Sequence, residues 1–162
     1  MSEVYLGNPN LKKANTAIEF SQEEILEFMK CKEDPVYFAN NYIKIVSLDE
    51  GLTQFHPYHF QEKLIKNFHG NRFNICKMPR QTGKSTTVVS YLLHYAVFND
   101  SVNIGILANK AATARELLGR LQTAYENLPK WMQQGIIAWN KGSLELENGS
   151  KILAASTSAS AV

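Results

Sequence analysis

Hydrophobic side chains recur at helical spacing in three stretches of the first 70 residues. "SQEEILEFMK" places Ile25, Phe28 and Met29 on one helix face, with Ser21 and Glu24 as a capping box. "DPVYFANNY" predicts a second helix, in which Asp34 caps the N-terminus and Pro35 takes the first helical position. "FHPYHFQEKLIKNFHG" predicts a third helix that stops at its glycine. The first 20 or so residues show no period, so we expect a loosely ordered lead-in there.

Strand and helix patterns alternate over the next 60 residues. "RFNICKM" predicts a strand, and "STTVVSYLLHYAVF" predicts a helix that is apolar around most of its circumference and therefore buried. "SVNIGILA" predicts a second strand, and "NKAATARELLGRLQTAYENL" an amphipathic helix capped by Asn109. Parallel strands joined by crossover helices explain this order, so the predicted fold class is α/β.

The remaining sequence carries two turn signals between short β-prone runs. The first runs from Asn140 to Ser143 and the second is Asn148-Gly149, a pair that favours the positive φ angles of a tight hairpin. We expect a small antiparallel meander at this end of the chain. We divide the chain into a helical lead-in, residues 1–55, and a second unit, residues 56–162.

The amino-acid composition does not indicate which class of molecule the protein binds. The 162 residues carry a net charge of +2 and 44% hydrophobic side chains, enough for one globular domain with a sizeable core. Cys31 and Cys76 lie far apart in sequence and suggest neither a disulfide nor a zinc site. No leader pattern and no run of about 18 apolar residues is evident, so we expect a soluble, unexported protein without membrane contact.

The residues "KMPRQTGKSTT" carry the chemistry. Gly83, Lys84 and Ser85 match the end of a phosphate-binding loop, which needs backbone N–H groups at a helix N-terminus, a lysine for the phosphates and a hydroxyl for Mg²⁺. The loop lies between a predicted strand and a predicted helix, as this chemistry requires. Met78, however, occupies the position where such loops begin with glycine. We interpret the stretch as a nucleotide site with an unusual front end.

The Arg-Gln pair ahead of this loop resembles the deviant Walker A motif of large terminase subunits, the DNA-packaging motors of tailed bacteriophages. "IVSLDEGLTQFHPYHFQEKLIKNF", "NIGILANKAATARELL" and "LPKWMQQGIIAWNKGSLELENGSKILAAS" are similar, in the same order, to the ATPase domain of the myophage type. The resemblance implies a P-loop NTPase fold of the RecA-like, additional-strand class. Residues 56–162 would then be the N-terminal part of the ATPase domain.

The resemblance also implies roles for the loop residues, with ATP and Mg²⁺ as cofactors. Lys84 would contact the transferred phosphate, and Arg80 would act in cis on the γ-phosphate, unless it is a structural arginine that binds loop carbonyls. Ser85 would hold Mg²⁺. The remaining nucleotide-binding positions would be Gln81, Thr82, Gly83 and Thr86.

Upstream, "PYHFQ" is similar to the adenine-side motif of the family. Gln61 would read the edge of the base, and Tyr58 or Phe60 would stack on its face. The alternative is structural: Phe60 belongs to the core and Tyr58 to the surface.

Other polar groups have simpler interpretations. Asp49 and Glu50 follow an apolar run, as in a Walker B strand, but they precede the loop and are expected in a solvated turn. The four histidines form no metal-binding pattern, and His94 is expected in the core. Lys110, Arg115 and Arg120 fit the wet face of an amphipathic helix, with DNA contact as the alternative.

No apolar strand ending in Asp-Glu follows Ser85, and no acidic cluster of the nuclease type follows either. We therefore expect a chain that ends before the Walker B strand, with a gap in its sheet, exposed apolar residues and no nuclease domain.

The function expected from the resemblance is ATP binding within a motor whose complete form translocates double-stranded DNA into procapsids. Its partners would be viral DNA, the portal protein and the small terminase subunit, in an oligomeric ring in the host cytoplasm. Whether this chain itself is an enzyme stays open. The alternatives are a fragment of a helicase-like P-loop translocase and a non-catalytic nucleotide-binding fragment.

Overall fold

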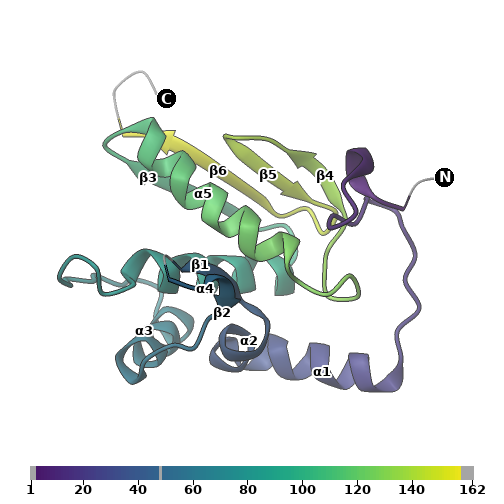
Figure 1. Ribbon diagram of the computed structural model, residues 1–162, viewed down its shortest axis with the longest axis horizontal. Coiled ribbons are helices and arrows are strands. Elements are labelled where there is room, and N and C mark those ends of the chain that lie inside the picture. The colour runs from purple at the N-terminus through teal and green to yellow at the C-terminus, as the bar shows by residue number, and fades with distance from the viewer. Residues whose placement is uncertain (1–2, 48, 158–162) are drawn as a thin grey trace.

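The computed structural model of the chain describes residues 3–47 and 49–157. A sheet and helix α5 form the upper half of the molecule in Figure 1, and helices α1 to α4 form the lower half. The helices are α1 (Gln22–Glu33), α2 (Pro35–Tyr42), α3 (His59–Gly70), α4 (Lys84–Phe98) and α5 (Ala111–Glu126), with a short 3₁₀ turn at Tyr5–Gly7. The strands are β1 (Lys44–Ser47), β2 (Gly51–Gln54), β3 (Asn103–Ala108), β4 (Ile136–Trp139), β5 (Ser143–Leu146) and β6 (Lys151–Ser156).

Four strands form one sheet in the order β3-β6-β5-β4. β4, β5 and β6 pair antiparallel in sequence, which confirms the predicted meander. Both predicted turns close hairpins: the Asn140 side chain accepts the backbone N–H groups of Gly142 and Ser143, and Gly149 has φ 82°. β6 continues the sheet by pairing parallel with β3, with Ile104 opposite Ile152. The α/β class is therefore confirmed, with a mixed sheet in place of the expected parallel one.

The strand predicted for "RFNICKM" is wrong. Residues 73–79 have no strand assignment, and Phe73 and Ile75 are 82% and 101% exposed. A strand is held by hydrogen bonds to a neighbouring strand, and no described strand lies beside this segment. The apolar pattern alone therefore does not place it in the sheet, and β3 keeps an unpaired edge.

The predicted caps of the first two helices are confirmed. Ser21 and Glu24 exchange hydrogen bonds of 3.1 and 2.8 Å in a capping box, and Asp34 accepts the N–H of Val36 with Pro35 in the first turn. The cap predicted for α5 is wrong, because that helix starts at Ala111 after Lys110 and has no side-chain cap.

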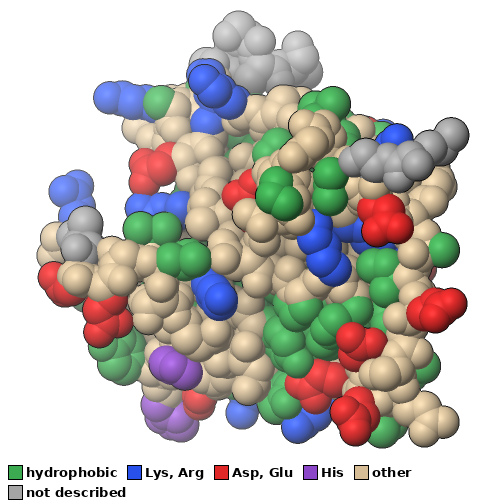
Figure 2. Space-filling view, turned by 45° about the vertical axis from the view of Figure 1, so that its right-hand side comes forward, with side chains coloured by type: hydrophobic (Ala, Val, Ile, Leu, Met, Phe, Trp, Pro, Cys, Tyr) green, Lys and Arg blue, Asp and Glu red, His purple; other side chains and the backbone are tan. Residues whose placement is uncertain are grey.

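The predicted apolar face of α1 is only partly buried. Phe28 packs edge-on against Phe98 at 4.9 Å, whereas Ile25 and Met29 are about half exposed and Leu26 is 71% exposed. Figure 2 shows hydrophobic and acidic side chains next to each other on the lower right of the molecule, where α1 lies.

The expectation of a loosely ordered lead-in is also wrong for residues 4–14. Leu11 is 1% exposed, and Ile136 of β4 donates to Lys12 and accepts from Ala14 through backbone groups. The buried Gln133 side chain accepts the N–H of Lys12 and donates to the carbonyl of Asn10. These long-range bonds join the first residues to the sheet, and local sequence periodicity does not predict them.

Helix α4 lies at the centre of the core. It packs against α2, α3 and α5, and Leu93, Ala96 and Val97 are at most 1% exposed. Leu11, Phe38 and Ile152 belong to the same buried cluster, so both predicted units contribute to one core. The division at residue 55 stays a prediction. Asp49 and Glu50 occupy the exposed turn between β1 and β2, as predicted.

Cys31 is buried, Cys76 is half-buried, and both are free thiols. No helix in the described ranges combines the length and apolar character that a bilayer crossing requires.

His94 is buried in α4 among aromatic rings. Its Nε2 lies 2.9 Å from the carbonyl oxygen of Cys31, so this nitrogen carries the proton and donates, while Nδ1 is buried without a partner. Burial lowers the pKa of His94 from 6.5 to about 4, against the opposing effect of the Cys31 carbonyl.

We predict that stability falls as the pH drops from about 6.5 to about 4. The folded chain keeps His94 neutral in this window while the unfolded chain binds a proton, at a cost approaching about 3 kcal/mol. His94→Phe should flatten this part of a urea-denaturation pH profile. His56→Gln is the control, since His56 is exposed, is not among the groups that shift the pKa of His94, and should leave the slope in place. An unchanged slope in His94→Phe would refute the assignment.

Candidate functional site

The candidate phosphate-binding loop lies between residues 73–79, which form no helix or strand, and the N-terminus of α4. Gln81 and Gly83 have φ angles of 62° and 71°, so two left-handed residues curve the loop within three positions. The Thr82 hydroxyl donates to the Pro79 carbonyl at 3.0 Å and closes this turn. Such alternation turns backbone N–H groups toward one concave side, as in anion-binding nests.

The start of α4 has no cap of its own. Gly83, at the N-cap position, has no side chain to accept a hydrogen bond, and the first helical bond runs from the N–H of Thr87 to the Gly83 carbonyl. Among the described residues, none accepts a hydrogen bond from the backbone N–H groups of Lys84, Ser85 and Thr86. Three unpaired donors at a helix N-terminus favour an anion.

Gln61 of α3 holds this loop from behind. Its side chain is 3% exposed, accepts the N–H of Tyr58 at 2.9 Å and donates to the Thr82 carbonyl at 3.1 Å. A Cβ on Gly83 would overlap the Gln61 amide nitrogen. Glycine is therefore required at position 83 both for its backbone conformation and for the close approach of Gln61.

The predicted base-stacking residues lie beside this anchor and outside the loop cavity. Tyr58 and Phe60 stack on each other with ring centroids 5.9 Å apart and planes 11° apart. Their exposed fractions are 70% and 45%, so Phe60 is not a core residue. The pair presents an open aromatic surface next to the anchor of the loop.

A cavity of about 470 Å³ opens in front of the loop. Every predicted loop residue lines it, namely Arg80, Gln81, Thr82, Gly83, Lys84, Ser85 and Thr86, together with Pro79 and Arg120. Three of these side chains are cationic, Arg80, Lys84 and Arg120, and no acidic residue in the described part of the chain lines the cavity. Its volume suits a small-molecule ligand, and its charge suits a polyanion.

Arg120 is the cavity residue that the sequence interpretation missed. It lies on α5, about 40 positions beyond the loop, where the sequence predicts only a solvent-exposed helix face or DNA contact. Its amphipathic helix gives no signal for this position, because the approach of α5 to the loop depends on the packing of α5 against α4.

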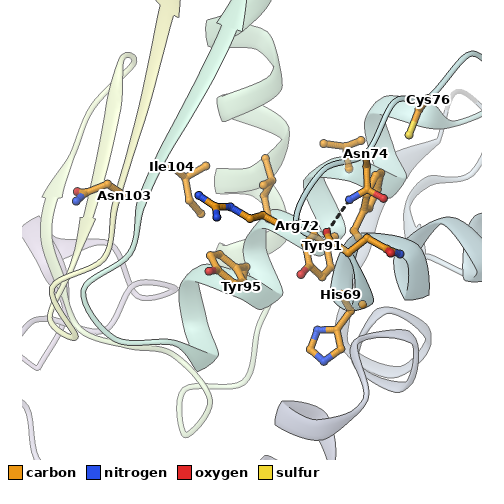
Figure 3. Close-up of a pocket in the computed structure, with 13 residues that line it drawn as sticks. His69, Arg72, Asn74, Cys76, Tyr91, Tyr95, Asn103 and Ile104 are labelled. Carbon is orange, nitrogen blue, oxygen red and sulfur yellow. Dashed lines mark hydrogen bonds between the residues drawn. The ribbon is translucent and has the colours of Figure 1, made fainter.

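A separate cavity of about 770 Å³ lies between the segment before the loop, α4 and the start of β3. In Figure 3 the Arg72 side chain extends toward Ile104 and Tyr95, and Asn74 donates a 2.9 Å hydrogen bond to the Asn71 carbonyl. Arg72 is the one Lys or Arg among the described residues that line this cavity, beside His69, Cys76, amides, tyrosines and apolar groups, and no residue of the loop lines it. The convergent charges lie in the loop cavity, which we therefore take as the candidate site.

The described residues contain no group of three or more His, Cys, Asp or Glu side chains placed to hold a metal ion. Asp49 and Glu50 lie in the β1–β2 turn, and neither lines the loop cavity. The cavity lining offers hydroxyls and no carboxylate among the described residues, so a Mg²⁺ ion at the loop would take most of its ligands from phosphate oxygens and water.

Comparison with known proteins places this chain in a family. Residues 75–161, more than half of the chain, match the family model described as terminase large subunit, T4likevirus-type, N-terminal. The crystal structure of the HK97 bacteriophage large terminase is similar, with 19% sequence identity and a TM-score of 0.62. That match covers 77% of this chain and 27% of the HK97 chain, so this chain spans about a quarter of the length of the HK97 protein.

We predict that Gly83→Ala destabilises the fold by about 2 kcal/mol, through the left-handed backbone and the displaced Gln61 amide. Gly119→Ala is the matched control, because that helical position has open space around it, and alanine there should be neutral or stabilising by up to about 1 kcal/mol. Urea denaturation of both variants measures the difference. Equal stability of Gly83→Ala and the parent chain would contradict the role of this glycine.

Proposed function

This chain belongs to the family of terminase large subunits of the T4-like type, and from that premise we propose that the loop of residues 79–86 binds the triphosphate of ATP. In this proposal the fold is that of a P-loop NTPase, and the complete protein hydrolyses ATP to move double-stranded DNA into procapsids. The observation that carries the proposal is the loop cavity itself, which brings three cationic side chains to three unpaired N–H groups.

Each loop residue has a task that its position supports. Lys84 begins α4 with an exposed side chain in the cavity, and its ammonium would contact the transferred phosphate. Arg80 is exposed at the opposite end of the loop, where its planar guanidinium would neutralise charge on the γ-phosphate. The backbone of Gln81, Thr82 and Gly83 would cradle phosphate oxygens, and the N–H of Thr86 would complete the helix N-terminus.

Ser85 is the proposed ligand of Mg²⁺. Its side chain lines the cavity one residue after Lys84, where a hydroxyl can reach an ion shared with the phosphates. When bound, Mg²⁺ supplies charge neutralisation at the β- and γ-phosphate oxygens.

The adenine would lie toward Tyr58, whose exposed ring is available for stacking. Reading of the base edge by Gln61 requires one of its two present hydrogen bonds to exchange, because Tyr58 and Thr82 occupy both ends of its amide. Gln61 would thus connect the base to the loop, because binding of the base to the Gln61 amide would alter the hydrogen bond from this amide to the Thr82 carbonyl.

Viral DNA, the portal protein, the small terminase subunit and an oligomeric ring at the procapsid in the host cytoplasm are proposed for the complete motor, of which the chain is one part. Membership of the terminase family disfavours the helicase-like alternative. Nucleotide binding without turnover remains a second candidate. It is favoured by the absence of an acidic lining residue among the described positions, since hydrolysis needs a group that orients water.

We predict that Lys84→Ala weakens Mg·ATP binding by about tenfold to a hundredfold, as expected for the loss of a charge-assisted contact to phosphate. Isothermal titration calorimetry measures the affinity. Lys77→Ala is the matched control, because Lys77 is exposed, lies close in sequence and does not line the cavity. Parent-like affinity in Lys84→Ala would overturn the proposed function.

A further inference from the structure

Arg120 reaches the loop cavity from a different element. The other eight lining residues form one continuous stretch, Pro79–Thr86, whereas Arg120 comes from the third turn of α5. Because α5 packs against α4 and against β3 and β6, Arg120 links the loop cavity to the helix that covers these strands.

In the structure Arg120 is paired with its own helix. Its Nη2 lies 2.7 Å from Oε1 of Glu116, one turn earlier, and both side chains are at least half exposed, at 50% and 62%. An exposed pair at this spacing is weak, because water solvates both charges well. The Arg120 guanidinium can therefore leave Glu116 at little cost.

Glu116 lies on only one side of Arg120. A second cavity of about 760 Å³, between β1, α4 and α5, is lined by Glu116, Arg120 and Thr86. Thr86 and Arg120 line both cavities, whereas Glu116 lines the second and not the loop cavity. Arg120 thus stands at the boundary between a carboxylate on one side and a cationic, donor-rich loop on the other.

We propose that Arg120 exchanges Glu116 for an oxygen of the bound triphosphate, so that occupation of the loop breaks an ion pair on α5. The inference rests on the proposed function, since it needs a phosphate ligand at the loop. A guanidinium forms stronger hydrogen bonds with a phosphate, which carries more charge than a carboxylate and is held by other donors. Glu116 restrains Arg120 in the absence of nucleotide and competes with phosphate for it.

The exchange connects the loop to the sheet. α5 contacts β3 and β6 directly, so a change in the charge balance at Arg120 acts on the helix that covers one face of these strands. Lys84 and Ser85 also approach this layer, because they share a small cavity with Ile106 of β3 and Leu117 of α5. Arg120 differs from them in lying on α5 itself, so through it nucleotide binding acts directly on the helix that covers the sheet.

The test compares Mg·ATP affinity by calorimetry in the parent chain and in Arg120→Gln, Glu116→Gln and the double variant. Arg120→Gln should weaken binding about tenfold, because one charge-assisted contact is lost. Glu116→Gln should strengthen binding about two- to threefold, because the competing carboxylate loses its charge. The double variant should bind like Arg120→Gln, since Glu116 acts only through Arg120.

Arg115→Gln is the matched control. Arg115 lies on the same helix, is exposed, and its Nε donates to the Ala111 carbonyl instead of facing the loop cavity. It should bind Mg·ATP like the parent. Parent-like affinity in Arg120→Gln, with binding still lost in Lys84→Ala, would overturn this inference and leave the proposed function standing. Weaker binding in Glu116→Gln would also overturn it, and absence of Mg·ATP binding by the parent would overturn both.

Discussion

The burial of α4 is the constraint on which the rest of the structure depends. Leu93, Ala96 and Val97 are enclosed by α2, α3 and α5, which fixes the direction of the helix axis. With the axis fixed, the N-terminus of α4 opens at the surface, and Gly83 leaves it without a side-chain cap. The unpaired N–H groups that define the candidate site are thus a consequence of how the core is packed.

The loop must also be held in its curved conformation, and one buried glutamine contributes to this. Gln61 spans from the start of α3 to the Thr82 carbonyl, and Gly83 leaves room for it. Loops of this kind usually begin with a glycine, whereas Met78 stands at that position here and does not line the cavity. The conformation of this loop is instead associated with the left-handed Gln81, the Thr82–Pro79 hydrogen bond and the Gln61 anchor. Non-glycine residues in that conformation are uncommon and cluster at functional sites.

Sequence patterns predicted what local chemistry determines. The capping box at Ser21, the turns at Asn140 and Asn148 and the position of the Gly-Lys-Ser loop all follow from neighbouring residues. The patterns failed where the structure depends on contacts between residues that lie far apart in the sequence. The apolar run around Ile75 has the composition of a strand but no described strand to pair with. The segment that contains the buried Leu11 is joined through Lys12 and Ala14 to Ile136, more than 100 residues away. Arg120 belongs to the same class, because only the packing of α5 on α4 brings it to the loop.

The most direct test of the account is a backbone amide chemical-shift titration of the isotope-labelled chain with Mg·ATP. We predict that the largest shifts occur at the amides of Gln81 to Thr86, with smaller shifts around Glu116 and Arg120. The contradicting result would be shifts centred on the other cavity, at residues 71–76 and at Tyr91, Tyr95 and Ile104, with the loop amides unchanged.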